Sequence, residues 1–237
     1  MKVRMYNVGF GDCFCLRDRK KSLLVDFGTN NSRIEGRPRR EIFDVIISDL
    51  STIKSKNLLL THFHMDHLSG LLYMMKKKDI SVDFGKIYLP DVFSKKEMSR
   101  TLVLLLLADL LKESGLPSRQ VSLFALVDAL LENKQNVELL SRGKLFENKY
   151  QALWPDTDVI RKETDEVYNR ICEDGKFKEV MDVLLEFAEK LRLIVWSMTA
   201  EGNKPAETVE KETDLTASEL TEQPEVRQKI IRAYVYE

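Results

Sequence analysis

Histidine, cysteine and long apolar runs are all scarce in this chain, which has 237 residues, three histidines and three cysteines. The cysteines, Cys13, Cys15 and Cys172, are odd in number and show no CxxC spacing, which favours a reducing compartment over a disulfide framework. The longest apolar run, Leu102 to Ala108, is far shorter than the ~18 residues of a transmembrane helix. No signal peptide is visible at the N-terminus. We therefore expect a soluble, cytoplasmic protein with no membrane partner.

A charge excess of either sign is also missing. Lysine and arginine total 37, aspartate and glutamate total 38, and the formal net charge is -1. This balance removes bulk electrostatic attraction to nucleic acid or anionic lipid, although a local patch remains open. Arg37 to Arg40 and Lys76 to Lys78 are candidate patches. If they flank a catalytic site they favour an anionic substrate such as a phosphodiester, and otherwise they are solvated surface charge.

The order of apolar and polar residues predicts an α/β fold. Residues 1–93 alternate short strands with helices, whereas residues 94–200 are mostly helical and look like an insertion or cap with one further strand at 150–154. Residues 201–237 form an acidic segment that we expect to be flexible. The expected elements of the first part are strands at Val3–Val8, Cys13–Arg17, Ser22–Asp26, Asn57–Leu60 and Ile87–Leu89, an exposed loop at Gly28–Arg40 and a helix at Glu41–Leu50.

All the histidines of the chain lie within six residues, at His62, His64 and His67. With Asp66 they form a His-x-His-x-Asp-His motif directly after the apolar strand. His62 and His64 project to the same side of an extended backbone, and Asp66 and His67 at the opening of a helix can face a second ion. Imidazole and carboxylate ligands suit zinc, with manganese or iron as alternatives. The motif predicts a metal site, whereas a histidine-rich loop without metal is the weaker interpretation.

The segment Leu58 to Gly70 resembles the signature motif of the metallo-β-lactamase superfamily. Leu23 to Gly28 resembles that family's earlier strand ending in Asp-x-Gly, and Val8 to Phe14 is similar to the start of its ComEC-like branch. The resemblance covers roughly residues 1–90. By itself, Gly9-Phe10-Gly11-Asp12 indicates a plain hairpin turn, since it lacks the lysine and the spacing of a phosphate-binding loop.

The resemblance implies a four-layer αββα sandwich and a zinc-dependent hydrolase, with two ions if the site is complete. His62 and His64 would bind the first metal, and Asp66 and His67 the second. A metal-bound hydroxide would attack a phosphoester or a related ester or amide bond, and Asp66 would orient it and take up its proton. Asp26 would hydrogen-bond to the motif loop and hold a ligand in place, unless it only caps a turn. Thr61 and Ser69 are further supporting residues, and Ser69 is expected to cap the helix rather than act as a nucleophile.

The later ligands of the family are missing, because no histidine follows His67. No Gly-Asp pair ends a later apolar strand either. Two explanations stay open: only the N-terminal half of the sandwich is complete in this chain, or the protein is a divergent member. The alternative function is therefore a catalytically incomplete metal-binding or protein-interaction module, in which the helical region mediates contact with a protein partner or with another copy. The substrate of an active enzyme would be a small-molecule or nucleic-acid phosphoester.

Overall fold

The computed structural model describes residues 1–18, 21–77, 83–113 and 122–200. The chain divides into two compact units: Met1–Pro90 together with Ala129–Glu138, and Asp91–Asp128 together with the chain from Leu139 onward. The predicted first part, 1–93, ends three residues later than Pro90, and the predicted boundaries 94–200 and 201–237 do not assign residues 129–138 to the first unit. The reason is a hydrogen bond of 2.8 Å from the Ile87 amide to the Asn136 carbonyl, which ties the later segment to the first unit.

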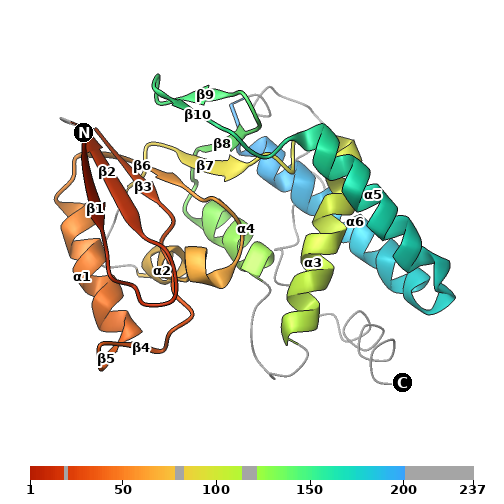
Figure 1. The fold of residues 1–237 in the computed structure, drawn as a ribbon, viewed down its shortest axis with the longest axis horizontal. Coiled ribbons are helices and arrows are strands. Elements are labelled where there is room, and N and C mark those ends of the chain that lie inside the picture. The colour runs from red at the N-terminus through yellow and green to blue at the C-terminus, as the bar shows by residue number, and fades with distance from the viewer. Residues whose placement is uncertain (19–20, 78–82, 114–121, 201–237) are drawn as a thin grey trace. The chain divides into compact units, whose positions relative to one another are not determined.

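A mixed six-stranded sheet dominates the fold, with strands in the order β1-β2-β3-β6-β7-β8 (Figure 1). The α/β class predicted from the sequence is confirmed, and the other two sheets among the described residues have two strands each. The six strands are β1 (Lys2–Met5), β2 (Phe14–Asp18), β3 (Lys21–Val25), β6 (Ser55–Leu59), β7 (Ile87–Pro90) and β8 (Val137–Leu140).

The direction of the strands decides which loops meet at one edge of the sheet. β1 pairs with β2 and β2 with β3 in antiparallel fashion, whereas β3 pairs with β6 and β6 with β7 in parallel. Leu24, Leu58 and Ile87 are register partners across the three parallel strands, and all three are fully buried. Because β3 and β6 run the same way, the segments that follow them leave the sheet at the same edge.

Helix α1 (Arg39–Ser51) packs in the first unit with its apolar stripe buried and its last turn tied to the sheet. Asp49 accepts hydrogen bonds from Arg17 at 2.9 Å and from the Tyr6 hydroxyl, and Arg4 pairs with it at 2.8 Å. Burial and this bond to Asp49 raise the pKa of Tyr6 above its ordinary value. The buried residues of the helix, spaced for one face, are Ile42, Phe43, Ile46, Ile47 and Leu50.

The segment predicted as an exposed loop, Gly28–Arg40, contains a small hairpin. β4 (Arg33–Ile34) and β5 (Arg37–Pro38) pair in antiparallel fashion next to the first turn of α1, visible at the lower left of Figure 1. Two-residue strands are too short for an alternating pattern to reveal them. The segment is otherwise exposed as predicted, apart from the buried Gly28, Thr29 and Ile34 and the half-buried Asn31.

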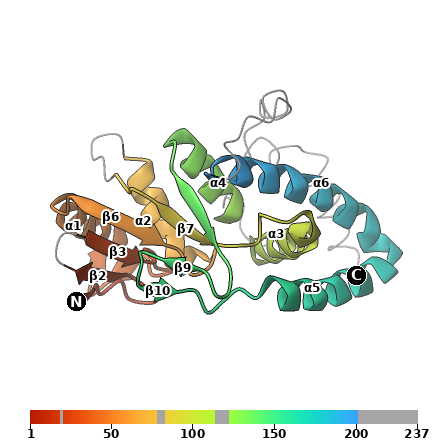
Figure 2. The ribbon, with the colours of Figure 1, turned by 90° about the horizontal axis from the view of Figure 1, so that it is seen from above.

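The described part of the second unit is mostly helical. Helices α3, α5 and α6 pack on one another, and α3 lies between the other two in Figure 2. Of the strand expected at 150–154, only Tyr150 and Gln151 form a strand, β10, and the expectation of a flexible segment at 201–237 falls outside the described residues. Elements not yet named are η1 (Lys96–Met98), α3 (Ser99–Glu113), α4 (Ser122–Glu132), β9 (Leu145–Phe146), β10 (Tyr150–Gln151), α5 (Thr157–Glu173) and α6 (Gly175–Ser197).

Within the described ranges, no helix combines the length and apolar character that crossing a bilayer requires.

Two glycines allow three backbone segments of the first unit to approach closely. A Cβ atom on Gly28 would lie 2.6 Å from the Asp66 carbonyl carbon and 2.6 Å from the Leu68 nitrogen. One on Gly11 would lie 2.3 Å from the Gly28 carbonyl oxygen. Both obstacles are backbone atoms, which cannot swing aside as a flexible side chain does. Glycine at these positions therefore holds the start of α2 against the segment after β3.

We predict that Gly28→Ala lowers the free energy of unfolding by ~1–3 kcal/mol, because the added methyl group overpacks a fixed backbone contact. Gly175→Ala is the matched control, since a Cβ there meets nothing within 4 Å. Urea denaturation followed by circular dichroism measures both. Equal stability of the two variants would contradict the close approach.

Candidate metal site

The loops that follow β3 and β6 bring together the residues of the candidate site. Asp26 comes directly after β3, and Thr61 and His62 follow β6. The pairing of Val25 with Leu59 sets the register, and the Asp26 amide donates to the Leu59 carbonyl at 2.9 Å. Asp26 then adopts a left-handed backbone conformation with φ of 55°, which aspartate tolerates better than most residues. This turn aims the carboxylate back toward the loop after β6.

Helix α2 (Met65–Met75) begins inside the histidine motif. His64 occupies the N-cap position with extended backbone angles, so Asp66 and His67 lie in the first turn of the helix. The His67 carbonyl accepts a hydrogen bond of 2.7 Å from the Phe27 amide. The motif thus changes from extended loop to helix at Met65, and its last two ligand-type residues have fixed backbone positions.

The Asp26 carboxylate is almost completely buried, with 2% of the residue exposed, and it is well supplied with hydrogen-bond donors. It accepts 2.8 Å and 2.7 Å bonds from the Thr61 amide and hydroxyl, and it lies 3.0 Å from Nδ1 of His67. A buried charge without such partners would cost several kcal/mol. Asp26 therefore makes the contact to the motif loop that the resemblance implied, and it reaches one of the expected ligands directly.

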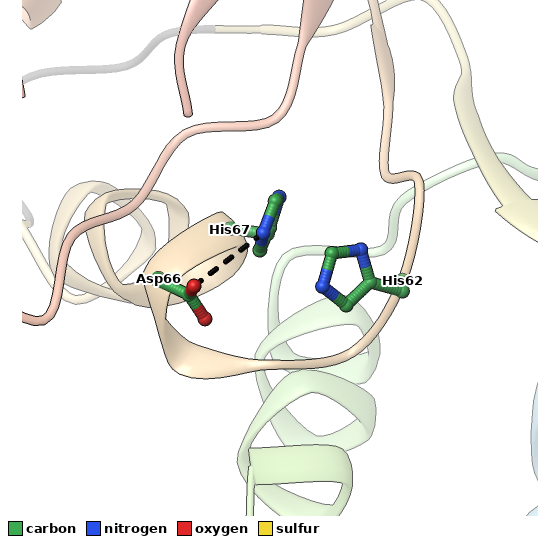
Figure 3. Close-up of side chains that lie close together, drawn as sticks. All are labelled: His62, Asp66 and His67. Carbon is green, nitrogen blue, oxygen red and sulfur yellow. Dashed lines mark ion pairs between the residues drawn. The ribbon is translucent and has the colours of Figure 1, made fainter. Parts of the chain in front are cut away.

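The contact with Asp26 fixes the orientation of the His67 ring. A proton on Nδ1 donated to the carboxylate leaves the lone pair of Nε2 for another partner. Nε2 lies 3.5 Å from Oδ2 of Asp66, an ion-pair distance. Figure 3 shows Asp66 and His67 on the first turn of α2 and His62 on the preceding loop, close to one another.

The ring of His62 contacts the rings of both His64 and His67. The ring centres of His62 and His67 are 3.7 Å apart, and those of His62 and His64 are 4.9 Å apart at nearly right angles. Burial, helped by the neighbouring His67 and His64, lowers the pKa of His62 below its ordinary value. A lowered pKa favours the neutral form of the His62 ring at neutral pH. Only a neutral imidazole has a lone pair that can bind a metal.

Two groups of side chains have ligand atoms within 4.8 Å of one another: His62, Asp66 and His67, and also Asp12, Asp26 and His67. His67 belongs to both, but its Nδ1 faces Asp26 and its Nε2 faces Asp66. The buried Asp26 already has three donors, so the first group fits a metal ion better. Two imidazoles and a carboxylate suit zinc, and three protein ligands leave a position open for water or substrate. His64 lies outside both groups, and its assignment with His62 to one of two ions stays a prediction.

Asp12 is the site residue that the sequence analysis did not single out. Its Oδ2 lies 3.7 Å from Nδ1 of His67, and its amide donates to the Asp66 carbonyl at 3.2 Å. The glycine-flanked stretch before it was interpreted as a plain hairpin turn. The stretch does connect two antiparallel strands. Because Met5 pairs with Phe14, however, the connection is the whole loop of residues 6–13, and this loop reaches across to α2. An aspartate after Gly-x-Gly was the available signal.

Ser69 was expected to cap the helix, and this is wrong. The helix begins at Met65, so Ser69 lies one turn inside it. Its hydroxyl instead accepts a hydrogen bond of 2.9 Å from the Thr29 amide and donates one of 3.0 Å to the Thr29 carbonyl. Ser69 therefore ties α2 to the segment after β3 from a buried position. The Thr61 hydroxyl, by contrast, donates a hydrogen bond to Asp26 and lies 3.0 Å from Nδ1 of His62.

These features define a mixed α/β unit with a histidine–carboxylate site at the carboxyl edge of its parallel strands. A family model described as the metallo-beta-lactamase superfamily matches residues 6–91, a range that includes every residue of this site. The resemblance found in the motif is therefore confirmed for this part of the chain. The superfamily typically binds metal ions such as zinc, and its members are generally hydrolases.

A curated relative also resembles this chain, over a length similar to that of the family match. The Endoribonuclease YSH1 of Mycosarcoma maydis is 32% identical over 77 residues, which are 32% of this chain and 8% of that protein. The chain therefore matches only a small part of that relative's length. No solved structure matches the chain. Neither comparison tests the ComEC-like branch, which stays a prediction.

We predict that Asp26→Asn weakens zinc binding by about 10–100-fold, because it removes the carboxylate that orients His67 while asparagine still tolerates the left-handed backbone. Isothermal titration with zinc measures this, and His62→Ala should abolish the same binding event. Asp44→Asn, on the partly exposed surface of α1, is the matched control. If Asp26→Asn abolished zinc binding as completely as His62→Ala, Asp26 would itself be a metal ligand. That result would favour the group of Asp12, Asp26 and His67 as the metal site.

Proposed function

We propose that this protein is a zinc-dependent hydrolase that cleaves a phosphodiester bond. The observation that carries the proposal is the site itself. His62, Asp66 and His67 lie close together, and the buried Asp26 carboxylate orients the His67 imidazole. The name of the relative from Mycosarcoma maydis, an endoribonuclease, supports the phosphodiester as the bond that is cleaved. A related ester or amide is the alternative within the same chemistry.

We assign two roles to the residues of the site, metal binding and proton transfer. His62, His64, Asp66 and His67 would hold zinc, which when bound lowers the pKa of water toward about 7 and polarises the phosphoryl oxygen. Asp26 keeps the His67 ring in one tautomer. Asp66, whose side chain is 22% exposed, is open enough to contact substrate and is the group that we assign to orient the attacking water and accept its proton.

A second candidate is a metal-binding or interaction module without turnover. It is favoured by the concentration of all three histidines in one motif, since the ligands that the family resemblance implies later in the chain would have to be of another type. In this case the helical second unit would bind a protein partner or a second copy. The two candidates share the metal site and differ in hydrolysis.

We further propose a reducing, cytoplasmic location. Cys13 and Cys15 are buried and free, and Cys172 is free and partly exposed. Neighbouring thiols that stay unpaired agree with a compartment that keeps cysteine reduced.

We expect the zinc-loaded protein to hydrolyse bis(p-nitrophenyl) phosphate, and we expect Asp66→Asn to lower kcat by about 10²–10⁴-fold through loss of proton transfer. Steady-state absorbance kinetics measure this, with zinc content determined for every variant and Asp44→Asn as the control. Faster turnover of p-nitrophenyl acetate than of the diester would overturn the choice of bond. Zinc binding without turnover of either substrate would favour the second candidate.

A further inference from the structure

Four exposed arginines surround the β4–β5 hairpin and the start of α1: Arg33, Arg37, Arg39 and Arg40. Arg33 donates to the neutral Gly36 carbonyl at 2.8 Å, and no carboxylate among the described residues pairs with it. Within the ranges that the structure describes, no ion pair involves Arg37, Arg39 or Arg40. The nearby acids in the segment are Glu35 and Glu41.

Folding does not explain this concentration of positive charge. Arginines close together repel one another, and the first turn of a helix favours acidic rather than basic residues. Pro38, at the N-cap of α1, supplies no side-chain hydrogen bond that would offset this. An anionic ligand at the hairpin would reverse the sign of these interactions.

Beside the hairpin, the ring of Phe10 faces solvent on a firmly held backbone. The residue is 73% exposed. Its amide donates to Asn31 Oδ1 at 2.6 Å, and its carbonyl accepts from the Asn30 amide at 2.9 Å and the Thr29 hydroxyl at 3.2 Å. Three hydrogen bonds fix the backbone of Phe10, while its large apolar ring stays exposed. Such a ring is suited to stack on a flat ligand.

The loop that carries Phe10 connects the hairpin to the candidate metal site. On one side, Asn7 Nδ2 donates to Glu35 Oε1 at 2.7 Å, and a Cβ on Gly9 would lie 3.3 Å from Cγ1 of Ile34. On the other side, Asp12 lies two residues after Phe10, with Oδ2 3.7 Å from Nδ1 of His67. The hairpin and the motif also follow parallel strands, so both leave the sheet at the same edge.

We infer that the arginines of the β4–β5 hairpin and the ring of Phe10 bind a single-stranded nucleic acid and lead its phosphodiester backbone to the candidate metal site. The inference rests on the proposed phosphodiester hydrolysis and names its substrate class. Guanidinium groups pair with successive phosphates, and an exposed aromatic ring stacks on a base that no complementary strand covers. A duplex hides its base faces and offers nothing to Phe10.

Lys76 and Lys77, the other basic patch suggested by the sequence, do not belong to this surface. They follow the C-terminal end of α2, a helix of 11 residues, about 16 Å along its axis from the motif. Lys77 also pairs with Asp44 at 2.5 Å.

The test is binding of a fluorescently labelled oligouridine to the zinc-loaded full chain, followed by fluorescence anisotropy over a range of salt concentrations. Phe10→Ala should raise Kd at least about fivefold through lost stacking. The triple variant Arg37→Gln, Arg39→Gln and Arg40→Gln should lower the slope of log Kd against log salt by about 2, as expected for three lost phosphate contacts to a single strand. Oligothymidine and a duplex of the same length serve as comparison ligands.

Matched controls come from the second unit. Arg161→Gln with Lys162→Gln removes exposed charge from α5, and Trp154→Ala removes an aromatic residue that is 58% exposed. Neither control should change Kd or the salt slope. Circular dichroism checks that each variant keeps the fold.

Three results would overturn the inference: an unchanged salt slope in the arginine variant, equal weakening by the controls, or duplex binding as tight as single-strand binding. Tight binding of polyphosphate that does not respond to Phe10→Ala would show a polyanion surface instead, and would also count against it. Tighter binding of oligouridine than of oligothymidine would identify RNA as the natural strand.

Gel electrophoresis of the strand after each titration separates this inference from the proposed hydrolysis. A strand that is bound through the arginines and stays intact supports the binding surface and contradicts the hydrolysis. A diester that is hydrolysed by a protein with no affinity for the strand supports the hydrolysis and contradicts the binding surface.

Discussion

The buried Asp26 carboxylate is the contact on which the arrangement of the site depends. It joins the loop after β6, through the Thr61 amide, to the first turn of α2, through His67. Its own position follows from the parallel register of β3 and β6. A slip of one residue between these strands would turn the Asp26 side chain to the other face of the sheet. The geometry of the metal ligands is therefore a consequence of sheet pairing some residues away from them.

Glycine supplies the second constraint. The segments around Asp12, Gly28 and Asp66 touch through their backbones, with the Gly28 amide donating to the Asp12 carbonyl at 3.2 Å. Such contacts need positions without a Cβ, and Gly11 and Gly28 provide them. The resulting loops are linked to one another by main-chain hydrogen bonds, which hold Asp12 and Asp66 in place without relying on their own side chains. Both carboxylates can therefore face His67 instead of holding their own loops.

The sequence predicted features that depend on local pattern, and it missed those that depend on distant approach. The motif follows a buried strand, β6, as expected. Asp12 was passed over because its proximity to His67 depends on the close contact of Gly11 with Gly28, which no spacing encodes. The capping role of Ser69 was wrong because α2 begins within the motif, and the β4–β5 hairpin was missed because its strands are two residues each.

In our proposal, the residues that attract a phosphodiester differ from those that cleave it, and the reason is electrostatic. Asp12, Asp26 and Asp66 all lie around His67, so the side chains alone give the site a negative potential that opposes an anionic substrate. A bound cation reverses that sign only locally, because charges in solvent are screened beyond about 8–10 Å. Attraction over a longer path has to come from other residues, and in our proposal the arginines of the hairpin supply it. A net charge of -1 is therefore compatible with the proposed nucleic-acid substrate, since a local cluster of arginines can attract a phosphate backbone without any excess of positive charge over the whole chain.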